Sequence, residues 1–101
     1  MLKLMVVDDE QIVLDSVRFI VERDLDGYEI CATARSGTEA ILRAEQTVPD
    51  LILMDIRMPG LNGLEAIREI RTRLPAVRCV VISACEQFEY AMCIAFNTGL
   101  V

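Results

Sequence analysis

The sequence predicts an α/β fold in which a doubly wound parallel sheet is covered by helices on both faces. Three short apolar runs, each followed at once by a polar residue, carry this prediction: 2–7 before Asp8, 51–54 before Asp55, and 79–82 before Ser83. Continuous apolar runs of this length are typical of strands buried on both faces. Segments with helical spacing separate these runs, so strands and helices alternate along the chain.

Length and composition favour one domain, residues 1–101. Hydrophobic residues make up 53% of the 101 residues, enough to bury a core, but a chain of this length does not build a second one. The net charge of −6 argues against a nucleic-acid surface, which is normally basic. No apolar run is long enough to span a membrane and no signal peptide is evident, so we expect a cytoplasmic protein without membrane contact.

The remaining elements follow from local patterns. A second strand is expected over 28–34, and apolar residues from Ile12 to Val21 follow helical spacing. Ser36 with Glu39 predicts the start of a helix that ends near residue 46, and Asn62 with Glu65 predicts another that ends near residue 73. A fourth helix is expected from Phe88 to Asn97, where almost every residue is apolar.

The four cysteines, Cys31, Cys79, Cys85 and Cys93, show no metal-ligand spacing, and the sequence has no histidine to complete a zinc site. In a cytosolic protein such cysteines are expected to be small buried apolar residues.

The acidic residues at the strand ends indicate the chemistry. In a doubly wound sheet with strand order 2-1-3-4, the first and third strands are neighbours, so Asp8, Asp9 and Asp55 should meet at one edge. Ser83 should arrive from the strand on the other side of Asp55. Clustered carboxylates repel one another, and a hard cation such as Mg2+ relieves the repulsion. A carboxylate beside Mg2+ is also a credible nucleophile toward phosphorus.

Simpler explanations exist for each residue taken alone. Asp8 or Asp9 could merely cap a helix, and Ser83 could be an ordinary loop serine. Asp55 is harder to explain in this way, because the next helix cap, Asn62, lies seven positions later. Taken together, the strand ends favour the functional interpretation.

The motifs around these residues resemble the signatures of response-regulator receiver domains in two-component systems. The matching segments are Val6-Val7-Asp8-Asp9-Glu10, residues 53–60 with Asn62-Gly63, and Val81-Ile82-Ser83-Ala84. The resemblance runs over the whole chain and covers about four of the family's five strand–helix units. It implies the flavodoxin-like receiver order 2-1-3-4, and a signalling phosphoacceptor domain that is not an enzyme.

The resemblance also implies roles for single residues. Asp55 corresponds to the phosphoacceptor, Asp9 to the direct Mg2+ ligand, and Asp8 to the acid that holds a metal-bound water. The backbone carbonyl of Arg57 corresponds to a further metal ligand.

Two residues of the fourth strand correspond to the family's switch region. Ser83 resembles the switch hydroxyl, and Ala84 the small residue that leaves room for the phosphoryl group. The stretch 88–91 is similar to receivers joined to AraC-type DNA-binding domains, which suggests transcriptional control. The partners implied are a sensor histidine kinase, a second copy in a homodimer, and DNA only through an output domain outside this chain.

The chain departs from the family at its carboxyl end, where the last strand–helix unit is expected to be missing. That unit carries the family's lysine, and the only lysine here, Lys3, lies at the opposite end of the first strand. Phosphorylation is therefore expected to be slow. The strand over 78–82 should then be an open edge that, with the fourth helix, promotes self-association.

Two alternatives remain open from the sequence. One is a signalling-impaired fragment that acts only as a self-associating module. The other is a phosphatase of the haloacid-dehalogenase type, although those enzymes carry a DxD pair after their first strand and this chain does not.

Overall fold

The computed structural model of the chain describes residues 1–55, 58, 60, 62–85 and 88–97. In chain order, its elements are β1 (Leu2–Val7), α1 (Gln11–Asp24), β2 (Tyr28–Ala34), α2 (Gly37–Thr47), β3 (Leu51–Asp55), α3 (Gly63–Arg73), β4 (Arg78–Cys85) and β5 (Phe88–Asn97). The predicted α/β fold is confirmed, and the helix and strand boundaries expected from the sequence up to β3 agree within a few residues.

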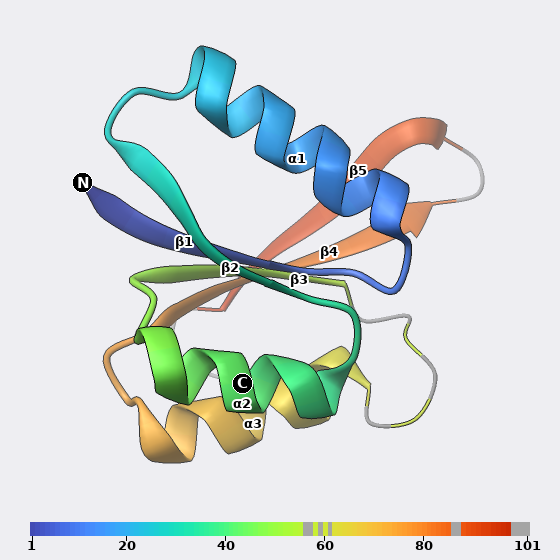
Figure 1. Ribbon diagram of the computed structural model, residues 1–101. Helices are drawn as coiled ribbons and strands as arrows, with labels where there is room; N and C mark the ends of the chain where they lie inside the picture. Colours follow the sequence, from blue (N-terminus) through green and yellow to red (C-terminus); the bar gives the residue numbers. More distant parts are fainter. Residues whose placement is uncertain (56–57, 59, 61, 86–87, 98–101) are drawn as a thin grey trace.

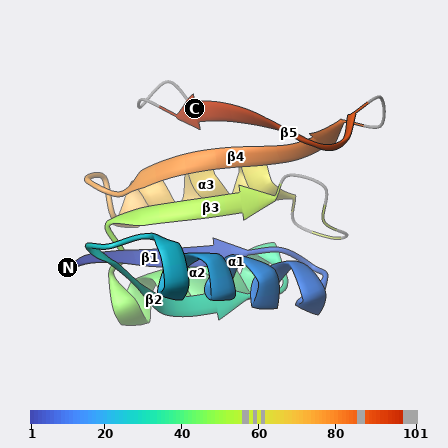
Figure 2. The same ribbon diagram turned by 90° about the horizontal axis from the view of Figure 1, so that it is seen from above.

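One sheet runs through the molecule in the order β2-β1-β3-β4-β5 (Figure 2). The first four of these strands pair in parallel, as the alternation of strands and helices predicted. The order 2-1-3-4 is therefore confirmed.

The fourth helix expected over Phe88–Asn97 is wrong, because this segment forms β5, which pairs antiparallel with β4. Its large apolar residues recur at every second position from Phe88 to Phe96, a period that suits a strand. The edge of β4, which would otherwise leave unpaired backbone groups, is thereby paired. The expected open β4 edge is wrong for the same reason.

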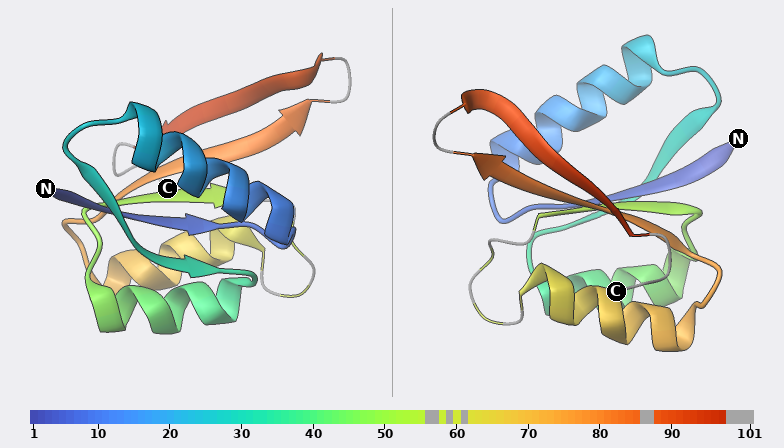
Figure 3. Two further views of the ribbon diagram at one scale, coloured as in Figure 1. Left: turned by 45° about the horizontal axis from the view of Figure 1, so that its top comes forward. Right: turned by 180° about the vertical axis from the view of Figure 1, so that it is seen from behind.

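Helices cover the parallel part of the sheet on both faces (Figure 1). On one face, α1 packs against β1 and β2; on the other, α2 and α3 lie side by side (Figure 3). Two apolar clusters fill these layers: one beneath α1 includes Leu4, Leu14 and Val21, and a larger one beneath α2 and α3 includes Ile52 and Ile67.

Local interactions explain where the helices begin. The Ser36 side chain accepts a hydrogen bond from the Glu39 N–H, and Asn62 forms a reciprocal capping box with Glu65. Both caps were predicted. None of the helices in the described part of the chain is long and apolar enough to cross a membrane.

The described cysteine side chains fit their predicted structural role. Cys79 is buried in the larger core cluster, and burial raises the pKa of its thiol to about 11 despite the nearby Arg71. Cys31 is half-buried and donates to the Thr47 hydroxyl. Neither cysteine is in a disulfide.

Asp50 joins three strands at the amino end of the sheet. Its carboxylate accepts from the Lys3 N–H at 2.7 Å, and its own N–H donates to the Lys3 carbonyl at 2.8 Å. Its carbonyl accepts from the Arg78 N–H at 3.1 Å. The Lys3 ammonium group donates to the carbonyl of Thr47. These bonds fix the starts of β1, β3 and β4 relative to one another, at the end of the sheet opposite the predicted site.

Candidate metal and phosphoryl site

The predicted acidic residues lie at the carboxyl ends of β1 and β3. Val7 is the register partner of Met54, so the next residues, Asp8 and Asp55, leave the two neighbouring strands at the same level. Both residues are half-buried. The sheet order thus brings together residues that are 47 positions apart, as the sequence predicted.

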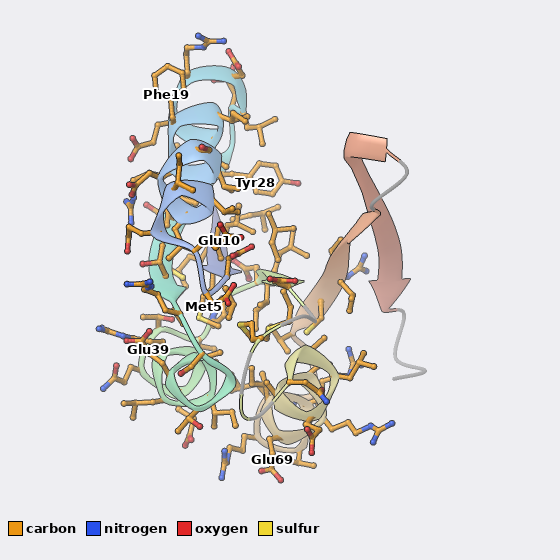
Figure 4. The ribbon with its side chains drawn as sticks, turned by 90° about the vertical axis from the view of Figure 1, so that its right-hand side faces the viewer. Met5, Glu10, Phe19, Tyr28, Glu39 and Glu69 are labelled. Atoms are coloured by element: carbon orange, nitrogen blue, oxygen red, sulfur yellow. The ribbon has the colours of Figure 1, made fainter. Side chains whose placement is uncertain are left out.

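Three consecutive acids form a compact group after β1. Asp8, Asp9 and Glu10 each offer a carboxylate oxygen, and these oxygens lie within 4.8 Å of one another. Glu10 is exposed and is the N-cap residue directly before α1; Figure 4 shows it from the carboxyl side of the sheet. Glu10 has no role predicted from the sequence, although it stands inside the motif Val6-Val7-Asp8-Asp9-Glu10.

The electrostatics of Asp8 show how closely these carboxylates are grouped. The pKa of Asp8 is raised to about 6, mainly by burial, and the negative charges of Asp55, Asp9 and Glu10 add to the rise. The hydrogen bond from the Glu10 N–H opposes this shift. The site therefore concentrates negative charge where desolvation already disfavours it, and a bound cation would relieve that cost.

Backbone interactions hold the loop between β1 and α1. The Asp8 N–H donates to the Ala34 carbonyl at 3.0 Å, which extends the pairing of β1 with β2 by one residue. The Glu10 N–H donates to Asp8 Oδ1 at 2.9 Å. From the end of β2, the Arg35 guanidinium donates to the Asp9 carbonyl through Nη2 at 2.9 Å and Nε at 3.3 Å. Arg35 could not be predicted from the sequence, because its contact with Asp9 depends on the β1–β2 register.

The other predicted site residues come from β4 and from the loop after β3. Ser83 and Ala84 lie in β4, directly after Ile82, which is the register partner of Asp55. The backbone thus brings Ser83 to the same end of the sheet as Asp55. Arg57 lies outside the described residues, so its predicted carbonyl ligand stays a prediction.

Lys3 cannot supply a cation to this site. It lies at the amino end of β1, and its ammonium group is hydrogen-bonded to Thr47 at the end of α2. The sequence-based placement of Lys3 at the far end of the strand is confirmed.

The donor set fits Mg2+. Hard divalent cations prefer oxygen ligands, and Mg2+ is usually held by one or two carboxylates with several waters. Asp8 and Asp9 belong to the grouped carboxylates after β1, and Asp55 ends the adjacent strand β3. The raised pKa of Asp8 marks a place where added positive charge is favourable.

Comparison with known proteins identifies the family. The model of the response regulator receiver domain matches residues 4–99. The chain belongs to this family. This receiver domain is 37% identical over 87 residues to the response regulator GacA of Pseudomonas syringae, covering 86% of the chain and 40% of GacA. It is also 37% identical to the chemotaxis protein CheY of Listeria monocytogenes, covering 86% of the chain and 71% of CheY.

A solved structure supports the same assignment. A LuxR-family two-component response regulator from Aurantimonas superposes with a TM-score of 0.78 at 35% identity, covering 85% of this receiver domain and 61% of that chain. The receiver domain spans well under half the length of GacA. The family belongs to two-component signal transduction, and the names of the relatives include regulators of transcription.

Proposed function

We propose that this receiver domain accepts a phosphoryl group on Asp55 from a sensor histidine kinase, with Mg2+ as cofactor. The observation that carries the proposal is the meeting of Asp55 with Asp8 and Asp9 at adjacent strand ends, where the charge of Asp55 raises the pKa of Asp8. A nucleophilic carboxylate and a cation site are the two components that transfer to an aspartate needs.

Different residues of the chain would have different roles in this phosphoryl transfer. Asp9, Asp55 and the Arg57 carbonyl would hold Mg2+ directly, and Asp8 would hold one of its waters. Mg2+, when bound, supplies positive charge that offsets the charge of the carboxylates and of the phosphoryl oxygens. Ser83 would donate a hydrogen bond to a phosphoryl oxygen, and Ala84 would leave space beside it.

The transfer itself is a displacement at phosphorus. An Asp55 carboxylate oxygen forms a bond to phosphorus while the bond to the imidazole nitrogen of the phosphorylated kinase histidine breaks. The electron pair of the broken bond stays on the imidazole nitrogen, which takes up a proton from solvent to give neutral histidine. Electrostatic stabilisation of the transferring group dominates such reactions, so the lack of any lysine besides Lys3 should make transfer slow in this chain.

The wider role follows from the relatives. We propose that the domain works in the cytoplasm, that it forms homodimers, and that it reaches DNA only through an output domain outside these 101 residues. The assigned family removes the argument for a haloacid-dehalogenase phosphatase. A signalling-impaired, self-associating fragment is the second candidate. It is favoured by β5, which pairs antiparallel with β4, and by a sequence in which Lys3 is the single lysine.

Acetyl phosphate tests the first candidate without a known kinase. Incubation with Mg2+ should add one phosphoryl group, read by intact mass, at a rate well below that of a receiver that has the lysine. Asp55→Asn should abolish the addition. Asp15→Asn, which removes an exposed carboxylate from α1, should leave it unchanged. Full labelling of Asp55→Asn would contradict the assignment, and no labelling of the wild-type chain would favour the second candidate.

A further inference from the structure

We propose that Arg35 is a positioning residue for the metal site, acting through the backbone of Asp9. This inference rests on the proposed function. The inference goes beyond that function by assigning a role to a residue outside the strand-end motifs, directly after β2, a strand that contributes none of the proposed ligands.

The position of Arg35 follows from the sheet. Ala34 ends β2 and is the register partner of Val7, so Arg35 leaves β2 at the level where Asp8 leaves β1. From there its guanidinium donates twice to one acceptor, the Asp9 carbonyl, at 2.9 Å and 3.3 Å. The planar fork of arginine suits this arrangement, because both donors point in a fixed direction.

The Asp9 carbonyl and the Glu10 N–H belong to the same peptide unit. Arg35 holds the carbonyl end of this unit, and Asp8 Oδ1 holds the N–H end at 2.9 Å. A peptide unit is planar, so bonds at both ends fix its orientation. That orientation in turn restricts where the Asp9 side chain can point.

Arg35 also connects the loop to α2. Its own N–H donates to Glu39 Oε1 at 2.6 Å, and the Glu39 N–H donates to the Ser36 side chain. The loop that carries Asp9 is therefore tied to the first turn of α2, whose small buried residues Gly37 and Ala40 anchor it in the core.

The group that accepts the hydrogen bonds of Arg35 indicates that Arg35 positions the backbone and does not neutralise a carboxylate. Within the described part of the chain, Arg35 forms no ion pair of 4 Å or less. Its donors go to a carbonyl, so the Asp9 carboxylate stays available for a cation. An arginine that paired with that carboxylate would compete with Mg2+; one that holds the backbone does not.

Arg35 affects Mg2+ affinity in two ways, through its charge and through the orientation of the peptide unit. The two effects have opposite signs and depend differently on salt. Its positive charge alone disfavours a nearby cation, and salt screens this effect: the screening length falls from about 8 Å at about 0.15 M to about 3 Å at about 1 M. Orientation of the peptide unit favours the cation and is much less sensitive to salt. Measurements at high salt therefore isolate the positioning effect.

The experiment is a Mg2+ titration of the 101-residue chain followed by the amide shifts of Asp9 and Glu10, at both salt concentrations. At high salt, Arg35→Gln should raise the Mg2+ dissociation constant about threefold to tenfold, less than the full loss of a charge-assisted hydrogen bond, because Arg35 acts on the cation only through the backbone. Arg35→Lys, which keeps the charge and can donate once, should give a smaller rise. At low salt, the rise in Arg35→Gln should shrink because removing the charge helps the cation.

Arg43→Gln is the matched control. Arg43 is exposed on α2 and its side chain makes no hydrogen bond to the acidic loop, so this variant removes the same charge and should match wild type at high salt. A readout without metal is the hydrogen exchange of the Glu10 amide, which should be faster in Arg35→Gln and unchanged in Arg43→Gln.

The possible results distinguish the positioning role of Arg35 from the proposed function of the domain. Wild-type affinity and wild-type Glu10 exchange in Arg35→Gln at high salt would overturn the positioning role and leave the proposed function intact. No saturable Mg2+ binding by the wild-type chain would overturn both.

Discussion

The backbone N–H of Glu10 donates a 2.9 Å hydrogen bond to the carboxylate of Asp8, yet the pKa of Asp8 is raised to about 6. The hydrogen bond favours the ionised carboxylate, but burial outweighs it, and the charges of Asp55, Asp9 and Glu10 add to the effect of burial. Above pH 6 the folded chain thus holds an ionised group in a place that disfavours it.

This relationship predicts a pH dependence of stability in the metal-free chain. The folded state binds the Asp8 proton more tightly than the unfolded state, whose pKa is near 3.8. The stabilising contribution of this proton is fully present below pH 3.8 and is lost as the pH rises through about 6. Urea unfolding at a series of pH values should show that Asp8→Asn gains stability relative to wild type over this range.

The control for the Asp8 prediction is Asp26→Asn, in the exposed turn between α1 and β2. Its stability should run parallel to that of wild type across the same pH values. A constant difference between Asp8→Asn and wild type at every pH would contradict the raised pKa of Asp8.

Mg2+ should stabilise the fold, and more so at higher pH. An ion that binds only the folded state raises the free energy of unfolding as the ion concentration rises. The carboxylates that hold Mg2+ must be ionised to bind it. The Mg2+-induced rise in Tm should be large at pH 7.5 and small at pH 5, because Asp8 is protonated at the lower pH.

Asp9→Asn should remove most of that rise in Tm, because the variant loses one of the proposed direct ligands. Asp15→Asn should keep all of it, since Asp15 lies exposed on α1 and bonds to Gln11. An equal Mg2+ response in Asp9→Asn and in wild type would rule Asp9 out as a ligand.

Removing the Asp50 carboxylate should weaken the amino end of the sheet. Asp50→Ala leaves the Lys3 N–H without its 2.7 Å acceptor, and the loss of such a charge-assisted bond costs about 1–3 kcal/mol in the free energy of unfolding. The exposure of Asp50 favours the lower part of this range. Denaturant unfolding measures the loss, while Mg2+ affinity should not change, because Asp50 lies at the opposite end of β3 from Asp55.

Much of the fold could be predicted from the sequence because its signals are local. Apolar runs that stop at Asp8 and Asp55 located the strands and the acidic edge, and the caps at Ser36 and Asn62 located two helices. The contacts of Arg35 could not be predicted in this way, since they require the β1–β2 register.

The segment Phe88–Asn97 shows how a local pattern can mislead. It is apolar at nearly every position, so its composition fits both a buried helix and a strand. Its alternation of large and small residues was the better guide, and the edge of β4 provided backbone partners for a strand.

Self-association remains a prediction, but from a different surface than the sequence suggested. Among the described elements, β5 contacts β4 alone, and α1 packs only on β1 and β2. On the α1 side of the sheet, Leu51 and Leu53 of β3 pack against the edge of the cluster beneath α1 and stay half-buried. Apolar side chains that stay partly exposed on a sheet face favour association.

Sedimentation equilibrium at micromolar concentration should show a dimer, the commonest closed assembly. Leu51→Lys should weaken the dimer by placing a charge on this face. Leu64→Lys, on the exposed side of α3, should not. A strictly monomeric wild-type chain would contradict the prediction.

The hydrogen bond from Lys3 to the Thr47 carbonyl holds the Lys3 amine at the end of the molecule opposite Asp55. The chain's single side-chain amine and its terminal amine both lie where β1 begins. Amine-directed coupling would therefore fix the protein to a sensor surface, or attach a fluorophore, by one end only. Asp55 and its neighbours would face the solution in every immobilised copy, so cation binding could be measured on an oriented layer.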